Sequence, residues 1–444
     1  MTPAARLSAA IEVLAAIDER PRPAGDALKA WGLAHRFAGS GDRAAIAGIV
    51  YDALRRRASA AWIMGEETPR AVLLGTLHLA RGLDVEAISR LADGSQHALS
   101  PLTEDERARL ANVKLDDAPP HVRGDYPEWL DAQFMQTFGD DRAEEGAALA
   151  FRAPLDLRVN TLKTTPEKAL SALAHLNPEP ARWSPTGLRI QFTAEGKLPP
   201  VTSEPMFLKG GYEIQDEGSQ LAAILTGARA GEQVLDLCAG SGGKTLALAA
   251  RMDNHGQIFA YDDDTRRLAP IHARLKRSGT RNVQVRSPRR PAGGRRSESH
   301  SSNGVLADLA GRMDMVLIDA PCTGTGVWRR NPDAKWRMRP GALEIRVNEQ
   351  SALLDQAVRY LKPGGRIAYV TCSVLDAENG AQIRAFLARH PGFAAVPPVE
   401  VAKALGDRGA ILRAAALLGP EGMLLTPRRT ETDGFFVAML RAPA

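Results

Sequence analysis

The spacing of apolar residues over positions 1–125 predicts helices. Apolar side chains recur at helical intervals in the first segment: Leu7, Ile11, Leu14 and Ile17. Asp42 is placed to cap a helix carrying Ile46 and Ile49, and Thr68-Pro69 and Asp84 predict two further helix starts. Because convincing strand alternation is absent here, we expect an all-α domain over residues 1–125.

Residues 126–222 carry a mixed pattern. Proline and glycine between positions 119 and 127 mark the boundary. An extended piece is expected at Leu155–Leu162, a helix near Pro166–Leu176, and a hairpin around Gly187 and Gly210-Gly211. We therefore expect a mixed α/β connecting subdomain.

From residue 223 to 444, short apolar runs alternate with helical segments. The predicted strands are Gln233–Leu237, Gln257–Tyr261, Val283–Val285, Met315–Asp319, Arg366–Cys372 and Phe435–Leu440. This alternation predicts a doubly wound parallel sheet, whose ligands bind beyond the carboxyl ends of the strands. The segment 288–304, rich in Pro, Gly, Ser and Arg, is expected to be a disordered insertion.

Composition narrows the class of protein. The chain has 444 residues with 44% hydrophobic and 25% charged residues, which is ordinary for globular domains. No apolar run approaches the roughly 20 residues of a membrane helix, and no secretion signal is expected. Three cysteines, none in a C-x-x-C, argue against a disulfide framework or a zinc site, so we expect a cytoplasmic protein without a metal. The net charge of +5 is only mildly basic.

A small-residue turn follows the first strand of the predicted sheet. It consists of Cys238, Ala239, Gly240, Ser241, Gly242, Gly243 and Lys244. A phosphate-binding P-loop would end in Gly243-Lys244-Thr245, but its first glycine would fall at Cys238, and a dinucleotide motif would lack its last glycine. The third reading is a nucleoside site, with Asp262 at the end of the next strand binding ribose hydroxyls. A purely structural turn capped by Asp262 remains the alternative.

Two of the three cysteines lie at strand ends. Asp319 and Cys322 follow one strand, and Cys372 ends another. If these strands are neighbours, both thiols face one crevice, where a thiolate could attack an electron-poor carbon and a carboxylic acid could assist. A lone cysteine is more often a small buried hydrophobe, as Cys238 could be.

The motifs together resemble the Sun/NOL1/NOP2 RNA cytosine-C5 methyltransferases. The resemblance rests on Leu235–Cys238 with Gly242–Thr245, Asp262, Asp319–Gly326, Asn331–Trp336, Thr371–Ser373 and Asp433–Phe436, and on the preceding Leu157–Lys163 and Gln215–Gln220. The N-terminal segment around Asp42-Arg43 and Val50–Arg56 looks like a NusB-type RNA-binding domain. The resemblance implies a multidomain protein with an all-α NusB-like domain and an α/β class I, Rossmann-like methyltransferase domain.

The family implies a function and a set of residue roles. S-adenosylmethionine would be the methyl donor, and a cytosine in small-subunit ribosomal RNA the acceptor. Cys372 would attack cytosine C6, Cys322 would assist loss of the C5 proton, and Asp319 would hydrogen-bond the cytosine ring beside the cofactor. Residues Cys238 to Lys244 would form the cofactor loop, with Asp262 on the ribose. Spacing alone does not say which cysteine is the nucleophile. No obligate protein partner is expected, and the protein is expected to be a monomer.

Two positions and two basic clusters complete the expectations. Ser287 stands where relatives often carry an acid at the adenine edge, and Asp308 is a weak substitute. From Arg266 to Arg296 there are eleven Lys or Arg and no acid, which could bind phosphate or form a solvated face. A second cluster, Arg329 to Arg339 with Trp328 and Trp336, is expected to contact substrate. The alternatives to a methyltransferase are a non-catalytic RNA-binding or ribosome assembly factor and a P-loop ATPase.

Overall fold

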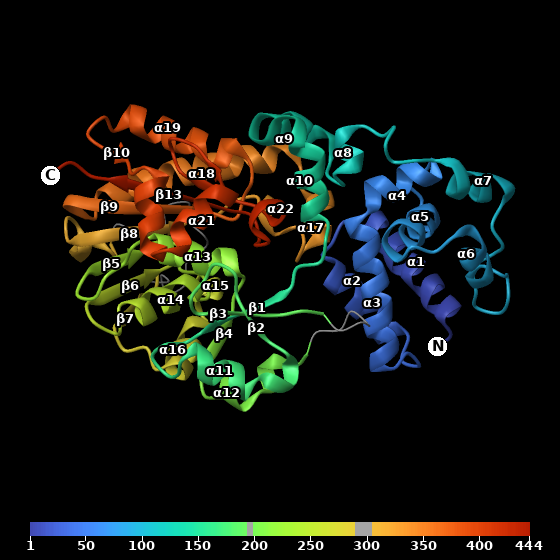
Figure 1. Ribbon diagram of the computed structural model, residues 1–444, viewed down its shortest axis with the longest axis horizontal. Coiled ribbons are helices and arrows are strands. Elements are labelled where there is room, and N and C mark those ends of the chain that lie inside the picture. The colour runs from blue at the N-terminus through green and yellow to red at the C-terminus, as the bar shows by residue number, and fades with distance from the viewer. Residues whose placement is uncertain (193–198, 289–303) are drawn as a thin grey trace, which may run out of the picture. The chain divides into compact units, whose positions relative to one another are not determined.

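The computed structural model describes residues 1–192, 199–288 and 304–444 (Figure 1). Contacts divide the chain into two units. Unit 1 consists of residues 1–152 and 327–340, and unit 2 of residues 153–326 and 341–444. This division differs from the expected boundaries at 125 and 222, because residues 126–152 fall in unit 1 and residues 153–222 fall in the same unit as the segment from 223. Among the described residues, no helix has both the length and the apolar character needed to cross a membrane.

Unit 1 is helical, as predicted for residues 1–125. Its helices are α1 Pro3–Glu19, α2 Ala24–Ala34, α3 Ser40–Arg55, α4 Arg57–Met64, α5 Pro69–Arg81, α6 Val85–Leu91, α7 Glu104–Asn112, α8 Pro120–Arg123, α9 Asp131–Phe138, α10 Arg142–Leu149 and α17 Pro332–Arg337. Thr68 and Asp84 cap α5 and α6 as expected. The predicted cap at Asp42 is wrong: α3 begins at Ser40, and Asp42 in its first turn pairs with Arg6 at 2.8 Å.

The segment 327–340 belongs to the core of unit 1. Lys335 is only 1% exposed, and its Nζ donates hydrogen bonds to the carbonyl oxygens of Arg55 (2.9 Å) and Asp125 (2.6 Å). Trp336 Nε1 donates to the Leu54 carbonyl at 2.6 Å, and Trp328 stacks on Phe134 with ring centroids 5.9 Å apart. Trp328 and Lys335 are buried within unit 1, so the substrate contact expected of these two side chains is wrong. For the exposed Arg337 and Arg339 it stays a prediction.

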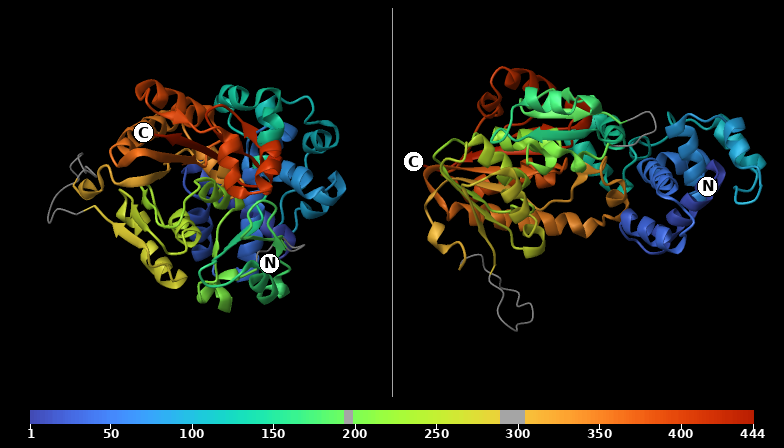
Figure 2. Two further views of the ribbon diagram at one scale, coloured as in Figure 1. Left: turned by 60° about the vertical axis from the view of Figure 1, so that its left-hand side comes forward. Right: turned by 90° about the horizontal axis from the view of Figure 1, so that it is seen from below.

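Unit 2 contains a small antiparallel sheet with the strand order β2-β3-β1-β4. Its segments are drawn in green in Figure 2. The strands are β1 Leu155–Val159, β2 Glu179–Pro180, β3 Gly187–Ile190 and β4 Tyr212–Ile214, with the helices α11 Pro166–Ala172 and α12 Pro205–Leu208. The extended piece and the helix predicted here are confirmed. Gly187 opens the second strand of the β2–β3 hairpin, whereas Gly210-Gly211 lead into β4, which pairs with β1 instead.

The large sheet of unit 2 has the order β11-β12-β13-β9-β8-β5-β6-β7, with β10 beside β13. Its strands are β5 Gln233–Asp236, β6 Gln257–Tyr261, β7 Val283–Arg286, β8 Met313–Asp319, β9 Leu361–Thr371, β10 Ala394–Ala395, β11 Leu417–Leu418, β12 Met423–Leu425 and β13 Phe435–Arg441. The five strands from β9 to β7 are parallel, but β13 runs antiparallel to β9. The sheet is therefore mixed, which corrects the expected all-parallel sheet.

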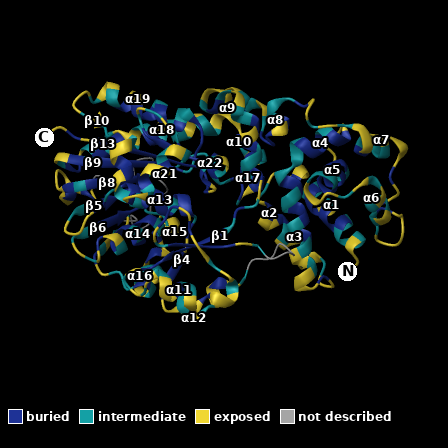
Figure 3. Cartoon of the chain, in the orientation of Figure 1, coloured by how far each residue is buried: buried dark blue, intermediate teal, exposed yellow. Residues whose placement is uncertain are grey.

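Both faces of this sheet are buried. The helices of unit 2 around it are α13 Glu217–Leu225, α14 Gly243–Arg251, α15 Thr265–Leu268, α16 Ile271–Ser278, α18 Pro340–Val358, α19 Gly380–Arg389, α20 Pro398–Val401, α21 Arg408–Ala415 and α22 Pro427–Thr430. Met315 and Leu317 of β8 join the core cluster that contains residues of α13 and α14. Val316 and Ile318, which point to the opposite face, are equally buried. Figure 3 shows the central strands as largely buried.

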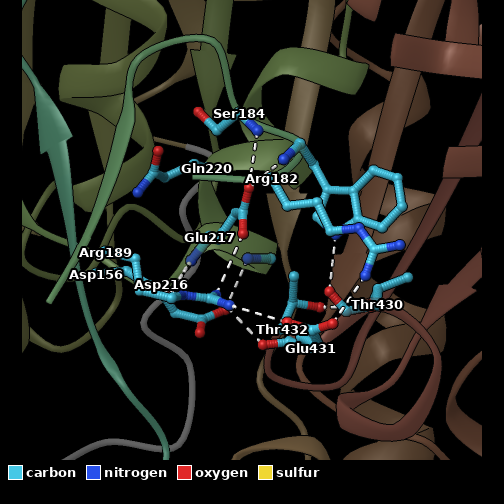
Figure 4. A network of polar contacts seen from close by, with 12 residues as sticks. Asp156, Arg182, Ser184, Arg189, Asp216, Glu217, Gln220, Thr430, Glu431 and Thr432 are labelled. Atoms are coloured by element: carbon cyan, nitrogen blue, oxygen red, sulfur yellow. Dashed lines mark hydrogen bonds and ion pairs between the residues drawn. The ribbon is translucent and has the colours of Figure 1, made fainter. Parts of the chain in front are cut away.

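A buried polar network joins the small sheet to the loop before β13 (Figure 4). Arg189 of β3 pairs with Asp156 at 2.7 Å and with Glu217 at 3.2 Å. Glu217 also accepts hydrogen bonds from the backbone N–H groups of Trp183 and Ser184, and Trp183 Nε1 donates to the Thr430 carbonyl. Burial raises the pKa of Glu217. The small sheet is therefore fixed to the large one through several satisfied polar groups.

Candidate active site

The small-residue turn connects β5 to α14 at the carboxyl edge of the large sheet. Gly240 and Gly242 have positive φ values of 49° and 85°, a conformation that side chains with a Cβ disfavour. A Cβ on Gly242 would also lie 2.5 Å from a side-chain carbon of Ile271. The turn thus brings backbone N–H groups to the start of α14, which favours polar or negative ligand groups.

A pocket of about 450 Å³ opens over this turn. It is lined by Ser219, Cys238, Ala239, Gly240, Ser241, Gly243, Lys244, Arg267 and Asp319. Most residues predicted for the cofactor loop therefore line one pocket, together with Asp319. Gly242 and Asp262 are not among the lining residues. Ser219 and Arg267 were missed, since a serine in a helix start and an arginine in a charge run gave no distinct signal.

Asp262 lies at the end of β6 and holds the turn from behind. It is 1% exposed, and its two carboxylate oxygens accept hydrogen bonds from the backbone N–H groups of Gly240 (2.8 Å) and Asp264 (2.9 Å). Burial raises the pKa of Asp262. Each carboxylate oxygen can accept more than one hydrogen bond, so Asp262 keeps capacity for a ligand hydroxyl.

Lys244 and Thr245 are engaged by protein carboxylates. Lys244 Nζ lies 2.8 Å from Asp319 Oδ1, and Thr245 Oγ1 donates to Asp236 Oδ2 at 2.6 Å. In a P-loop these two side chains would face nucleotide phosphates and their metal ion. Their engagement here argues against the ATPase alternative. Among the described residues, no group of three or more His, Cys, Asp or Glu side chains could hold a metal ion.

The two strand-end cysteines meet. β8 and β9 are parallel neighbours, with Asp319 opposite Val370, which confirms the adjacency on which the two-thiol crevice depended. Cys322 Sγ and Cys372 Sγ are 3.2 Å apart. Gly326 N–H donates to the Cys372 carbonyl at 2.9 Å, so the loop after Cys322 folds back onto the loop of Cys372. The two thiols form a pair in direct contact.

The three thiols differ in their surroundings. The hydrogen bond with Cys372, together with burial, raises the pKa of Cys322 well above its usual range. Burial and nearby carboxylates, led by Asp236, raise the pKa of Cys238. A neutral Cys238 is a poor nucleophile. Its side chain is partly exposed and lines the pocket, so it is not the fully buried hydrophobe considered above. Of the three cysteines, all of which lie among the described residues, Cys322 and Cys372 are the two whose thiols are in contact.

Three arginines of the first basic stretch take part in close ion pairs. Arg274 and Arg277 both pair with Glu213, and Arg286 pairs with Asp308 at 2.8 Å. These three side chains stabilise the fold; binding of phosphate by the rest of the stretch stays a prediction. The second part of the stretch, with the insertion predicted at 288–304, lies almost entirely outside the described residues. The Asp308 carboxylate is engaged by Arg286. No observation therefore places Asp308 at the adenine edge in the role that Ser287 lacks.

Comparisons with known proteins agree with this geometry. A family model described as "16S rRNA methyltransferase RsmB/F" matches residues 223–441, and one for an RsmF/B-like ferredoxin-like domain matches residues 126–194. The ribosomal RNA small subunit methyltransferase B of Sodalis glossinidius is 32% identical over 380 residues, which cover 84% of this chain and 77% of that protein.

Solved structures give the same picture of the fold. The crystal structure of PH0851 matches with a TM-score of 0.69 and 25% identity, over 99% of both chains. NSun6 from Pyrococcus horikoshii, whose structure was determined with SFG, matches with a TM-score of 0.58 and 21% identity, over 72% of this chain and 98% of that one. The latter likeness concerns the fold alone.

Proposed function

Because the chain belongs to the RsmB/F family of 16S rRNA methyltransferases, we propose that it methylates C5 of a cytosine in small-subunit ribosomal RNA through its cysteine pair. It is an S-adenosylmethionine-dependent RNA methyltransferase. The observation that carries the cytosine-C5 chemistry is the contact between Cys322 and Cys372, 3.2 Å apart. A pair of thiols suits a reaction that needs a nucleophile and a separate base.

The pocket over the turn from Cys238 to Lys244 fits S-adenosylmethionine. The volume of this pocket, about 450 Å³, lies in the range of small-molecule sites. When bound, S-adenosylmethionine supplies a methyl group activated by its sulfonium. Asp262 would hold the ribose hydroxyls, and the backbone from Cys238 to Lys244 would line the rest of the cofactor. Asp319, which lies in the same pocket, would reach both the cofactor side and the cytosine.

Cys372 is assigned as the nucleophile because the family resemblance places that role at this position. Its sulfur adds to cytosine C6, and the electron pair of the C5–C6 double bond makes C5 nucleophilic. C5 takes the methyl group of S-adenosylmethionine, and S-adenosylhomocysteine is the other product. Cys322 then removes the C5 proton, the double bond reforms and the C6–sulfur bond breaks. The target base must leave its stack for this attack, as base-modifying enzymes require.

The contact between the thiols bears on when Cys322 can act as a base. Its pKa is raised first of all by the hydrogen bond with Cys372. Once Cys372 sulfur is bonded to C6, that partner can no longer share a proton or carry a charge. The part of the pKa shift of Cys322 that comes from an ionisable Cys372 is then lost, whereas burial still raises the pKa. This change favours Cys322 as the base in the later step.

Unit 1 is the proposed RNA-recognition domain of the protein. Its helical core agrees with the NusB-like expectation, and the family's ribosomal RNA substrate requires a binding surface. We further propose that the protein acts as a monomer in the cytoplasm.

Replacing each cysteine tests the covalent chemistry. Cys372→Ala is expected to abolish turnover and any covalent link to RNA. Cys322→Ala still permits attack and methyl transfer, but the C5 proton stays, so the RNA–protein link persists. Denaturing electrophoresis with labelled RNA and S-adenosylmethionine should show a shifted band for Cys322→Ala only.

Cys238→Ala is the control for loss of a thiol outside the pair, and no persistent link is expected from it. The reverse pattern for the paired cysteines would show that Cys322 is the nucleophile. Wild-type turnover in both variants without any adduct would refute covalent catalysis.

A further inference from the structure

A dipeptide beyond the second cysteine is buried at the catalytic edge without belonging to the motifs singled out above. Glu378 ends a short 3-10 turn, Asp376–Glu378, and Asn379 precedes α19. Glu378 is 0% exposed and Asn379 is 3% exposed. A buried carboxylate costs free energy unless donors satisfy it, so its partners indicate what it does.

The Glu378 carboxylate holds the loop of Cys322 from both sides. The backbone N–H of Thr323 donates to Oε1 at 2.8 Å, and the hydroxyl of Thr323 donates to Oε2. Gln350 Nε2 donates both to Glu378 Oε1 (3.0 Å) and to the Pro321 carbonyl (2.9 Å). Thus the residues on either side of Cys322 are tied to Glu378, one directly and one through Gln350.

The Asn379 amide holds the loop of Cys372 in the same way. Its Oδ1 accepts a hydrogen bond from Thr371 Oγ1 at 2.6 Å, and its Nδ2 donates to the Ser373 carbonyl at 2.9 Å. Thr371 and Ser373 are the two neighbours of Cys372. Asn379 therefore contacts both chain neighbours of Cys372, and Glu378 is linked to both chain neighbours of Cys322.

We propose that Glu378 and Asn379 are positioning residues which hold the two cysteine loops so that the thiols stay in contact, Glu378 for Cys322 and Asn379 for Cys372. The assignment of steps to each residue rests on the proposed function. No hydrogen bond joins either residue to the thiols; each holds its loop through the backbone and side chains of the cysteine's neighbours. The charge of Glu378 also contributes, after the Cys372 contact and burial, to the raised pKa of Cys322. Because the two residues are adjacent in the chain, a single peptide unit links the two cysteine loops, in addition to the hydrogen bond from Gly326 N–H to the Cys372 carbonyl.

Loss of Glu378 and loss of Asn379 should affect different steps of the reaction. A misplacement of about 1 Å in a reacting group can cost roughly 100-fold in rate. Loss of the Glu378 contacts should displace Cys322, the proposed base, so product release slows and the RNA adduct accumulates. Loss of the Asn379 contacts should displace Cys372, so the adduct forms slowly and does not accumulate.

The experiment compares Glu378→Ala and Asn379→Ala in the full-length protein, with labelled RNA and S-adenosylmethionine. We expect kcat to fall by roughly 10- to 100-fold in both, with less change in the affinity for S-adenosylmethionine. On denaturing gels, Glu378→Ala should show a shifted band like Cys322→Ala, and Asn379→Ala should show none. Glu378→Gln, which keeps the shape and an acceptor oxygen, should restore most of the rate.

Two further variants guard against a trivial loss of folding. Thr323→Val removes one hydrogen bond to Glu378 without burying new polar groups, and should produce a weaker form of the same adduct accumulation. Glu217→Ala removes a matched buried carboxylate that also accepts backbone N–H groups. It should lower the melting temperature without a persistent adduct. Adduct accumulation in Glu217→Ala to the level of Glu378→Ala would overturn the proposal.

A second measurement does not depend on RNA. Diamide oxidises two adjacent thiols to a disulfide and takes up their two hydrogens at its N=N bond. Cross-linking of Cys322 to Cys372, followed by mass spectrometry, should be about tenfold slower in Glu378→Ala and in Asn379→Ala than in the wild type or Glu217→Ala.

Unchanged cross-linking rates in both variants would refute the positioning role, whatever the reaction. If instead Cys322→Ala formed no adduct while cross-linking still slowed in both dipeptide variants, the covalent function would fail and the positioning role would stand.

Discussion

At the scale of single residues, the position of Asp262 leads to a prediction about binding of the cofactor. Its carboxylate already supports the turn through Gly240, and we expect it to hold the ribose. Asp262→Ala should weaken S-adenosylmethionine binding by about 1.5–3 kcal/mol, the value of a hydrogen bond to a charged group. Titration calorimetry measures this, with the exposed neighbour Asp263→Ala as the control. Equal affinity in Asp262→Ala and wild type would remove Asp262 from the site.

The burial of Lys335 predicts how the free energy of unfolding depends on pH. Burial lowers its pKa to about 7 in the folded protein, against an ordinary value of 10.5. Between these pH values the unfolded chain binds more protons at Lys335 than the folded one. The contribution of Lys335 to stability is therefore fully present above the unfolded pKa and is lost as the pH falls toward 7.

The matched variant is Lys335→Met, which has a side chain of similar length without the charge. The stability of the wild type relative to Lys335→Met should rise with pH from about 7 to about 10, by at most about 1.4 kcal/mol per pH unit. Melting temperatures at pH 7, 8 and 9 test this. A constant difference, or one that shrinks with pH, would show that Lys335 is not buried in its neutral form.

At the scale of elements, a contact between two glycines keeps the loops at the catalytic edge together. Gly434 N–H donates to the Gly326 carbonyl at 2.8 Å, and a Cβ on Gly326 would lie 2.2 Å from the Gly434 carbonyl oxygen. Gly326→Ala must therefore push the loop after Cys322 away from the loop before β13. We expect a loss of about 1–3 kcal/mol in stability, typical of overpacking, together with slower methylation.

Gly341→Ala is the matched control, because a Cβ there has no heavy atom within 4 Å and lies in helix α18. It should leave stability unchanged or raise it by up to about 1 kcal/mol. Differential scanning calorimetry compares the two variants. A Gly326→Ala protein as stable and active as Gly341→Ala would mean that the loops are free to separate.

The elements that could be predicted from the sequence are those with a local signal. Thr68 and Asp84 cap helices because their side chains bond the first turn, and the apolar runs of β5, β6 and β8 are strands. The direction of β13 could not be predicted, since a buried run such as Phe435–Leu440 is equally apolar in either orientation. The pairing of Cys322 with Cys372 required the strand order, which no local pattern contains.

The expected substrate contact by Trp328 and Lys335 is wrong for a different reason. A run of Arg and Lys beside tryptophans has the same sequence pattern whether it binds phosphate or packs inside the protein. Lys335 is buried because backbone carbonyls of Arg55 and Asp125, far away in sequence, accept its hydrogen bonds. Likewise, nothing local to Glu378 and Asn379 shows that their partners flank the two cysteines.

At the scale of the whole molecule, we expect binding of RNA to depend steeply on salt. Phosphate contacts release counterions, so the logarithm of the affinity should fall with the logarithm of the salt concentration by about 0.7–0.9 per contact. The arginines already paired with Glu213 and Asp308 should contribute little to this slope. Filter binding at several salt concentrations, with Arg274→Gln as a paired-arginine control, measures it. A flat response would count against recognition through the phosphate backbone.

The placement of residues 327–340 restricts how such a protein can change over evolutionary time. Domain shuffling usually joins genes at linkers, so that a new recognition module replaces an old one in a single recombination event. Here the codons for Trp328, Lys335 and Trp336 lie downstream of those for Cys322, yet their side chains fill the interior formed by the first 152 residues. A crossover near codon 152 would replace the residues against which these side chains pack. Such hybrids should be viable only when the distant stretch is exchanged as well, so lineages of this protein are expected to inherit the two stretches together.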